Sequence, residues 1–224
     1  MTNDALKALR EQGKKVLLIP HDETVAFDQV DAILFIDPTI KEESLPRGQY
    51  VLGRPILPVY LEPRPSNVAC PNIGFAGFAF DHKHIERILD LIKAEGPDFA
   101  CKVRLHLPPS DYGYNPSYID QIVTQFQQQV ETTVCRDFMK AEDLVRFMAE
   151  NDINIFPYED KRVVNRGISS ITDIALASGR PFMISESNMF RHFAPEHREM
   201  ITIGKISIRD VLTKGCMPYR HYAH

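Results

Sequence analysis

Apolar residues follow two alternating patterns along the second half of the chain. Between residues 73 and 212, short apolar runs typical of buried strands alternate about six times with segments whose apolar residues recur every three or four positions. The segment 82–96, for example, places its isoleucines on one helical face and ends at a glycine. This alternation predicts an α/β fold, in which a doubly wound, mostly parallel, Rossmann-like sheet carries helices on both faces.

The first 64 residues are less regular. KKVLLIP and DAILFID predict two strands that follow a short helix over residues 4–12. Prolines then break up the next apolar stretch, and the passage PVYLEPRPSNVACP contains four of them. We therefore expect a partial α/β segment over residues 1–64 and a Rossmann-like domain over residues 65–224.

Composition narrows the kinds of protein this chain can be. Of its 224 residues, 44% are hydrophobic and 25% are charged, as is usual for globular proteins. A net charge of −4 offers no electrostatic basis for binding nucleic acid. The sequence predicts neither a membrane span nor a signal peptide. Four widely spaced cysteines predict reduced thiols rather than a disulfide or a metal site, so we expect a cytoplasmic location.

The stretch 152–193 carries a candidate ligand site. Two short apolar strands, DINIF and PFMIS, flank a helical segment that Gly167 and Gly179 bound. Ser169 or Ser170 can cap this helix, which leaves N–H groups and the positive end of the helix dipole facing the loop. Such a helix start, at the carboxyl end of a parallel strand, suits a phosphate group, but the pattern also fits an ordinary capped strand–helix–strand unit.

Charged residues near this helix favour the phosphate interpretation. Arg166 precedes Gly167, and these two residues form a plausible diphosphate cradle together with the serines at 169 and 170. Asp173 lies about one turn into the helix, where it can bind sugar hydroxyls or only complement the helix dipole.

Four further candidates lie elsewhere in the chain, and each has a plainer alternative. Gly77 in GFAGFAF lets the backbone approach a ligand, or only eases a turn among phenylalanines. Lys83 can reach a phosphate, or remain a solvated surface residue. The charge of Arg104, on a predicted strand, needs either a partner carboxylate or an anionic ligand. His21, beside an aspartate, suits a general base or a solvated loop.

Four passages in order resemble the donor-binding lobe of GT-B-type glycosyltransferases: GFAGFAFDHKHIERILDLIK, KVRLHLPP, CRDFMKAEDLVRFMAENDINIFPYE and RGISSITDIALASGRPFMIS. In that family a first strand ends in a glycine turn, a later strand has the form "aDv.v.Ps", and a helix ends in "A-small-G-x-P". The resemblance covers about residues 70–213. Hydrolase and kinase interpretations fall away, because the chain contains no GxSxG, HExxH or Walker lysine motif.

The resemblance implies a nucleotide-diphosphate sugar as the donor substrate, with no metal and no separate cofactor. It places Arg136 and its neighbours up to Phe138 near the nucleotide base. The diphosphate would lie against Gly77, Gly167, Ser169 and Ser170. With the candidates found from the residues themselves, Lys83, Arg104 and Arg166 complete the expected donor site, and His21 and Asp173 are the candidate catalytic residues.

Two departures from the family pattern leave the activity open. The positions of the family's acidic pair hold Arg166 and Ile174, and Phe78 replaces the arginine of the first glycine turn. The first lobe is also short, so a protein partner supplying an acceptor lobe, a fragment of a larger enzyme and a reduced form are all open. The leading hypothesis is a glycosyltransferase with an unknown acceptor. The alternatives are a nucleotide-sugar epimerase and a non-catalytic binding or assembly module.

Overall fold

The computed structural model describes residues 3–20, 30–54, 56–57, 61, 64–110, 115–160, 167–193 and 201–214. They belong to two compact units, of which the first is Met1–Pro55 with Arg162–Ile168 and the second is Ile56–Lys161 with Ser169–His224.

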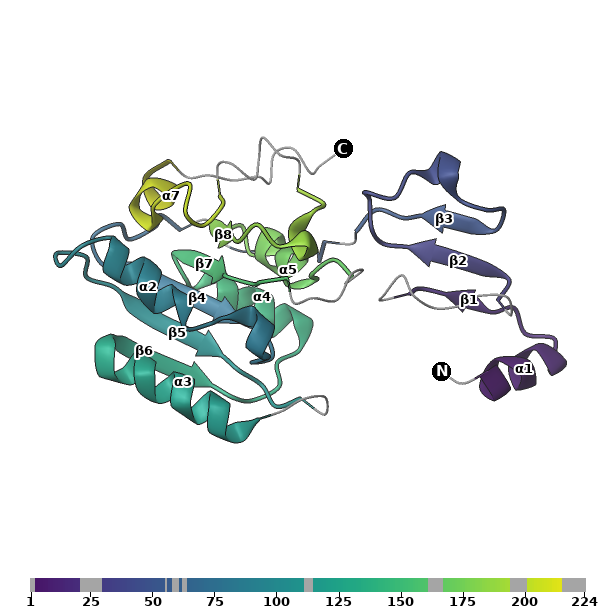
Figure 1. Ribbon diagram of the computed structural model, residues 1–224, viewed down its shortest axis with the longest axis horizontal. Coiled ribbons are helices and arrows are strands. Elements are labelled where there is room, and N and C mark those ends of the chain that lie inside the picture. Colours follow the sequence, from purple (N-terminus) through teal and green to yellow (C-terminus); the bar gives the residue numbers. More distant parts are fainter. Residues whose placement is uncertain are drawn as a thin grey trace. The chain divides into compact units, whose positions relative to one another are not determined.

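The first unit contains a small parallel sheet. Its strands lie in the order β1-β2-β3, and a helix precedes them (Figure 1). The two strands expected from KKVLLIP and DAILFID are present as β1 and β2, although both are shorter than the apolar runs. The elements are α1 (Asn3–Glu11), β1 (Leu17–Leu18), β2 (Ala32–Phe35), η1 (Glu42–Ser44) and β3 (Gln49–Val51).

The second unit is built on a five-stranded parallel sheet. Its strand order is β6-β5-β4-β7-β8, so the chain starts in the middle, builds outward to one edge, and then returns to build the other half. The strands are β4 (Asn72–Ala76), β5 (Lys102–His106), β6 (Glu131–Cys135), β7 (Ile153–Phe156) and β8 (Phe182–Ile184). The reversal of direction lies between β4 and β7.

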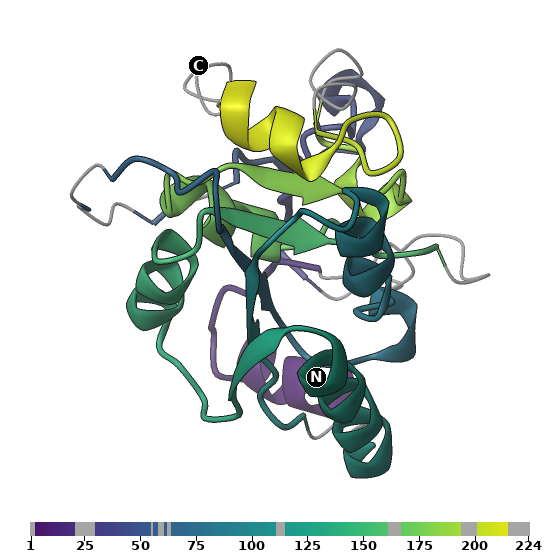
Figure 2. The same ribbon diagram turned by 90° about the vertical axis from the view of Figure 1, so that its left-hand side faces the viewer.

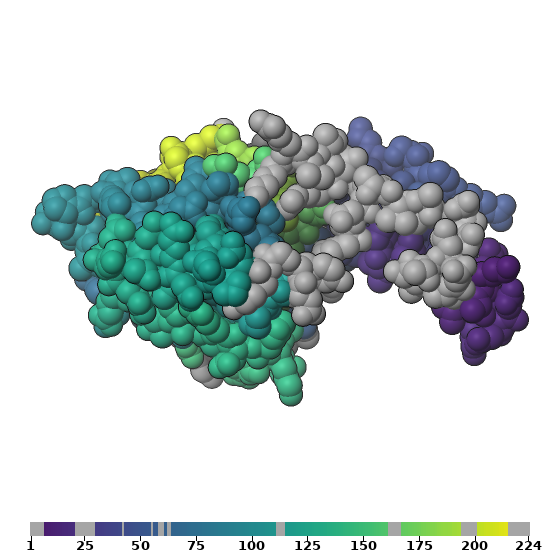
Figure 3. All heavy atoms as spheres, turned by 60° about the horizontal axis from the view of Figure 1, so that its bottom comes forward, coloured from purple at the N-terminus to yellow at the C-terminus, as the bar shows by residue number. Residues whose placement is uncertain are grey.

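Helices cover both faces of this sheet, as the sequence predicted. In Figure 2, α2 and α3 lie on one side of the sheet and α4 on the other. The polar face of α3 forms part of the outer surface, seen in teal in Figure 3. The helical elements are η2 (Asp81–Lys83), α2 (Arg87–Ala94), α3 (Pro116–Gln129), α4 (Ala141–Ala149), α5 (Ile171–Ala177), η3 (Asn188–Phe190) and α7 (Ile208–Lys214). None of the helices that the structure describes is long and apolar enough to cross a membrane.

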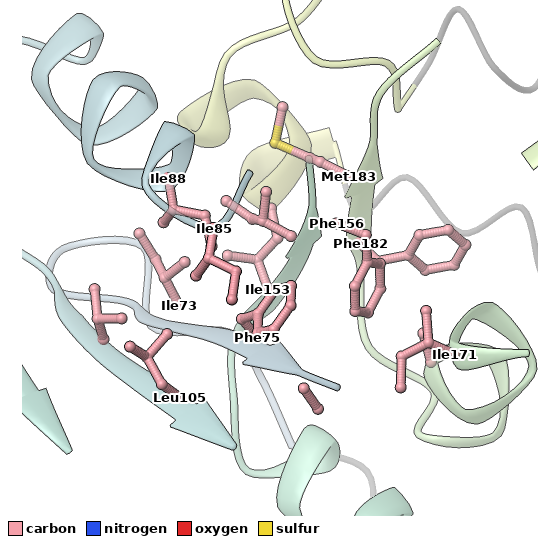
Figure 4. Close-up of a cluster of buried hydrophobic side chains, with 14 of the residues drawn as sticks. Ile73, Phe75, Ile85, Ile88, Leu105, Ile153, Phe156, Ile171, Phe182 and Met183 are labelled. Atoms are coloured by element: carbon pink, nitrogen blue, oxygen red, sulfur yellow. The ribbon is translucent and has the colours of Figure 1, made fainter. Parts of the chain in front are cut away.

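The core of the second unit lies between the sheet and these helices. All four residues of β7 are buried, as expected for a central parallel strand covered on both faces. Figure 4 shows Ile85 and Ile88 next to Ile73 on one side, and Ile171 of α5 next to Phe182. Each such side chain stabilises the fold by about 1.5–3 kcal/mol when fully buried. The periodic apolar residues of the sequence therefore account for the layers.

A buried polar network joins β5 and β7 to the end of α4. The Asn151 side-chain amide donates to Asn154 Oδ1 at 2.8 Å, and the Asn154 amide donates to the Met148 carbonyl at 3.2 Å. Arg104 completes the network by donating to Asn151 Oδ1 at 3.0 Å. A Cβ atom on Gly74 would overlap the Asn151 amide and come within 2.5 Å of Asn154 Oδ1. Position 74 must therefore be glycine for this network to form.

Gly74→Ala should destabilise the protein by about 2–3 kcal/mol, because the new methyl group must displace buried, hydrogen-bonded asparagines. Urea unfolding followed by circular dichroism measures this loss. Gly53→Ala is the matched control, since a Cβ atom there meets nothing within 4 Å. The control should stay within about 0.5 kcal/mol of the wild type. Equal losses in the two variants would contradict the role of Gly74.

Candidate functional site

The carboxyl ends of β4 and β7 meet where the strand order reverses. β4 ends at Ala76 and leads into Gly77, and β7 ends at Phe156 and leads through a proline to Tyr158. In doubly wound sheets, ligands bind in the crevice that forms where the two halves of the sheet diverge. The second unit therefore places its candidate ligand site around these two loops.

The end of the Lys83 side chain fills the space beside Gly77. Gly77 has a φ of +140°, a backbone conformation that residues with a side chain rarely adopt. Its N–H donates to the carbonyl of His106 at 3.0 Å, which holds the turn against β5. A Cβ atom on Gly77 would lie 2.8 Å from Lys83 Nζ and 3.7 Å from the Tyr158 hydroxyl oxygen. The missing side chain thus lets an ammonium group lie against the backbone at Gly77, with a phenol close by.

Lys83 places an enclosed positive charge at this point. The residue is half-buried, and its Nζ lies 4.7 Å from the centre of the Tyr158 ring and 6.0 Å from that of Phe80. Removal of the ammonium group from water lowers the pKa of Lys83 to about 8. Among the residues that the structure describes, no carboxylate lies within ion-pair distance of Lys83. An enclosed cation of this kind favours an anionic ligand.

Tyr158 forms the floor beneath Lys83. The residue is only 1% exposed, and burial raises the pKa of its phenol, so the hydroxyl stays protonated. The nearby Ser169 side chain counteracts part of this rise in the pKa of Tyr158. The Ser169 hydroxyl and the Tyr158 hydroxyl nevertheless do not meet the geometry of a hydrogen bond. The structure therefore gathers three of the predicted donor-site residues, Gly77, Lys83 and Ser169, around a tyrosine.

Comparison with solved structures identifies the fold. α,α-Trehalose 6-phosphate synthase from Burkholderia multivorans matches with a TM-score of 0.58 and 12% sequence identity, over 96% of this chain and 63% of the synthase. Anabaena HepE in complex with UDP and glucose matches with a TM-score of 0.63 and 10% identity, over 96% of this chain and 67% of HepE. The chain has the fold of the GT-B-type glycosyltransferases.

The pneumococcal O-GlcNAc transferase GtfA, in complex with UDP and GlcNAc, also matches, with a TM-score of 0.51 and 10% identity. That match covers 97% of this chain and 47% of GtfA. The chain thus spans less than two thirds of the length of GtfA and of the Burkholderia synthase. The sequence matches no family model, and no curated protein is significantly similar to it.

At the start of α5, the structure departs from the expected serine cap. Ser170 is the residue before the helix, but its φ of −71° and ψ of −14° are helical, and its side chain accepts no hydrogen bond from the helix. The Ser169 N–H donates to the Met189 carbonyl at 3.0 Å, so it is already used. The prediction that either serine caps the helix is therefore wrong. Asp173 is buried in the first turn of α5.

Other predicted residues of this GT-B fold have protein partners or lie elsewhere. Arg104 donates to Glu150 at 2.6 Å and stacks 4.7 Å from the Phe147 ring centre, so a partner carboxylate accounts for its charge. Arg136 forms an ion pair with Asp120 at 2.7 Å. Gly167 belongs to the first unit. His21 and Arg166 lie outside the described residues.

A polar hollow of about 270 Å³ lies beside this site. Within it, Arg87 and Glu159 form an ion pair at 2.8 Å, and Asp160 accepts a hydrogen bond from the Ser187 hydroxyl at 2.7 Å. The lining residues are Arg87, Tyr158, Glu159, Asp160, Ser185, Glu186, Ser187 and Ile203.

Tyr158 was not predicted as a site residue. It had one sequence signal, because an aromatic residue stands where the family pattern "aDv.v.Ps" has a small one. The described residues contain no group of three or more His, Cys, Asp or Glu side chains that suits a metal ion.

The low pKa of Lys83 should make the stability of the free protein depend on pH. The pKa is about 8 in the folded protein and 10.5 for an ordinary lysine, so the unfolded chain binds more protons between these values. The free energy of unfolding should therefore rise with pH across this window, by about 1–3 kcal/mol from Lys83.

Urea unfolding at pH 7.5 and pH 10 measures how much the free energy of unfolding rises between the two pH values. The test compares this rise between the wild type and two variants. Lys83→Met should lose this part of the rise, because methionine has no proton to release. Lys93→Met, which changes an exposed lysine of α2, should keep it. A Lys83→Met variant with the same pH dependence as the wild type would contradict the enclosed ammonium.

Proposed function

We propose that this chain is the donor-binding part of a glycosyltransferase, which transfers a sugar from a nucleotide-diphosphate sugar to an acceptor still to be identified. The observation that carries this proposal is Lys83, an enclosed cation without a carboxylate partner among the described residues, whose ammonium group lies against the backbone at Gly77. A diphosphate supplies the negative charge that this place lacks. The position, at the carboxyl edge of a GT-B sheet, supports the same conclusion.

Uridine diphosphate is the first nucleotide to test. HepE and GtfA are structural neighbours whose structures hold UDP, with glucose in one and GlcNAc in the other. We extend this chemistry to the present chain as part of the proposal. The source of the acceptor lobe stays open in the proposal between a protein partner, the rest of a larger enzyme and a reduced form, because the chain spans 63% of the Burkholderia synthase.

The proposed chemistry assigns a role to each donor-site residue. When the bond to the sugar breaks, negative charge grows on the departing diphosphate, and a positioned cation stabilises it. Lys83 provides that cation, so the proposal needs neither metal nor cofactor. Gly77 lets the phosphates approach the backbone, and the Ser169 hydroxyl can donate to them. His21 remains the proposed general base, and Asp173 the residue proposed to bind sugar hydroxyls.

One observation favours a second candidate, a non-catalytic binding module. Phe78 stands where the family pattern has an arginine, and its ring packs 5.7 Å from Phe80 and 6.2 Å from Phe138. Ile174 stands where the pattern has an acid. Such a module would bind the nucleotide-sugar without turning it over, and a sugar-release assay on the bound donor separates the two functions.

Calorimetry with UDP-, GDP- and ADP-sugars, and with the free nucleotides, tests the proposed function. At least one should bind, and Lys83→Met should weaken that binding about 10–100-fold, because a charge-assisted contact to phosphate is lost. Affinity should also fall as the pH rises above about 8, since binding requires the protonated ammonium. Lys93→Met should bind like the wild type. If no member of the panel binds, the proposal fails.

A further inference from the structure

Tyr158 carries a buried hydroxyl group without a hydrogen-bond partner among the described residues. Buried hydroxyls nearly always find a partner, because an unsatisfied one is costly. A phenylalanine would fill the same space without that cost. The hydroxyl group of Tyr158 therefore needs an explanation other than packing.

The surroundings of Tyr158 hold its ring in place. The ring centre lies 5.2 Å from that of Phe190, 6.2 Å from that of Phe156 and 6.3 Å from that of His82. The Tyr158 carbonyl accepts a hydrogen bond from the Ser185 hydroxyl. A ring enclosed in this way cannot turn its hydroxyl toward water to find a partner.

The hydroxyl group and the Lys83 ammonium converge on the same place. They lie 3.7 Å and 2.8 Å from the point that a Cβ atom of Gly77 would occupy. Lys83 also covers one side of the ring, with its Nζ 4.7 Å from the ring centre. The lysine stem is flexible, so an anion that draws the ammonium toward itself also uncovers the phenol.

We infer that Tyr158 is a ligand-binding residue, whose hydroxyl donates a hydrogen bond to a phosphate oxygen held by Lys83 where these two side chains converge near Gly77. This inference rests on the proposed function and names a residue of the donor site that nothing in the sequence pattern assigned. Burial keeps the phenol protonated, so Tyr158 acts as a donor and adds no charge of its own. The ligand supplies the partner that the buried hydroxyl lacks.

Tyr158→Phe tests the inference, because it removes the hydroxyl and keeps the ring under Lys83. The probes are UDP and inorganic pyrophosphate, with affinity measured by calorimetry. The variant should bind the probe about tenfold more weakly or worse, the usual effect of losing a hydrogen bond to a charged group. Its thermal midpoint should equal or exceed that of the wild type, because the removed hydroxyl had no partner.

Tyr118→Phe is the matched control. Its hydroxyl already has a protein partner, Glu86, to which it donates at 3.4 Å, so the variant should bind both probes like the wild type. A merely structural role for Tyr158 would lower the thermal midpoint and leave the affinity unchanged. The inference predicts the opposite pair of results.

The outcomes separate the inference from the proposed function. If UDP binds equally to wild type and Tyr158→Phe, the inference is overturned and the proposed function stands. If pyrophosphate binds and needs the hydroxyl while no nucleotide binds, the inference holds and the nucleotide-sugar function falls. If neither probe binds the wild type, both fail. Should Tyr158→Phe not fold, pyrophosphate must still perturb the tyrosine ultraviolet spectrum of the wild type, and an unchanged spectrum overturns the inference.

Discussion

The second unit depends on one buried carboxylate, Asp152, which is 0% exposed. Its two oxygens accept backbone N–H groups of Asn67 and Asn72 at 2.9 and 2.8 Å, and Arg64 lies 3.2 Å away. These bonds attach the passage before β4 to the start of β7, next to the pairing of Ile73 with residue 153. Because both strands start at this carboxylate, their carboxyl ends also come out side by side. Without this carboxylate the two N–H groups would lose their partner, so Asp152 supports the geometry of the candidate site from the opposite edge of the sheet.

Buried polar groups at the two edges of the sheet differ in whether they have partners within the protein. At the amino edge, Asp152 and Asn151 have protein partners for their side chains. At the carboxyl edge, the Tyr158 hydroxyl has no hydrogen-bond partner among the described residues, and the enclosed Lys83 ammonium has no carboxylate within ion-pair distance among them. The same chain therefore satisfies polar groups where they serve the fold and leaves them unsatisfied at the switch point of the sheet. Uncompensated polar groups in a well-packed protein are typical of functional sites, because the ligand completes them.

Much of the fold follows from the sequence, since the periodic apolar residues and glycine punctuation mark the strands and helices of the second unit. The local glycine turn also led to Gly77 and Lys83. The pairing of Lys83 with Tyr158 was out of reach, because it joins loops 75 residues apart whose approach depends on strand order. The serine cap failed for a backbone reason, the helical dihedral angles of Ser170. The contacts of Arg104 needed the packing of α4 against the sheet.

The strand order gives the candidate site its place in the sheet, and its electrostatics determine which ligands suit it. With a pKa of about 8, Lys83 is mostly charged at neutral pH while already deprived of much of its water. A phosphate relieves that deficit, whereas a neutral sugar has no charge to offer. Affinity should therefore come mainly from the diphosphate, and discrimination among sugars from groups that hydrogen-bond hydroxyls. Glu159 and Asp160, in the neighbouring polar hollow, have that chemistry, but their partners Arg87 and Ser187 hold them. A sugar that engages these carboxylates must exchange hydrogen bonds with the protein, so it adds specificity more readily than affinity.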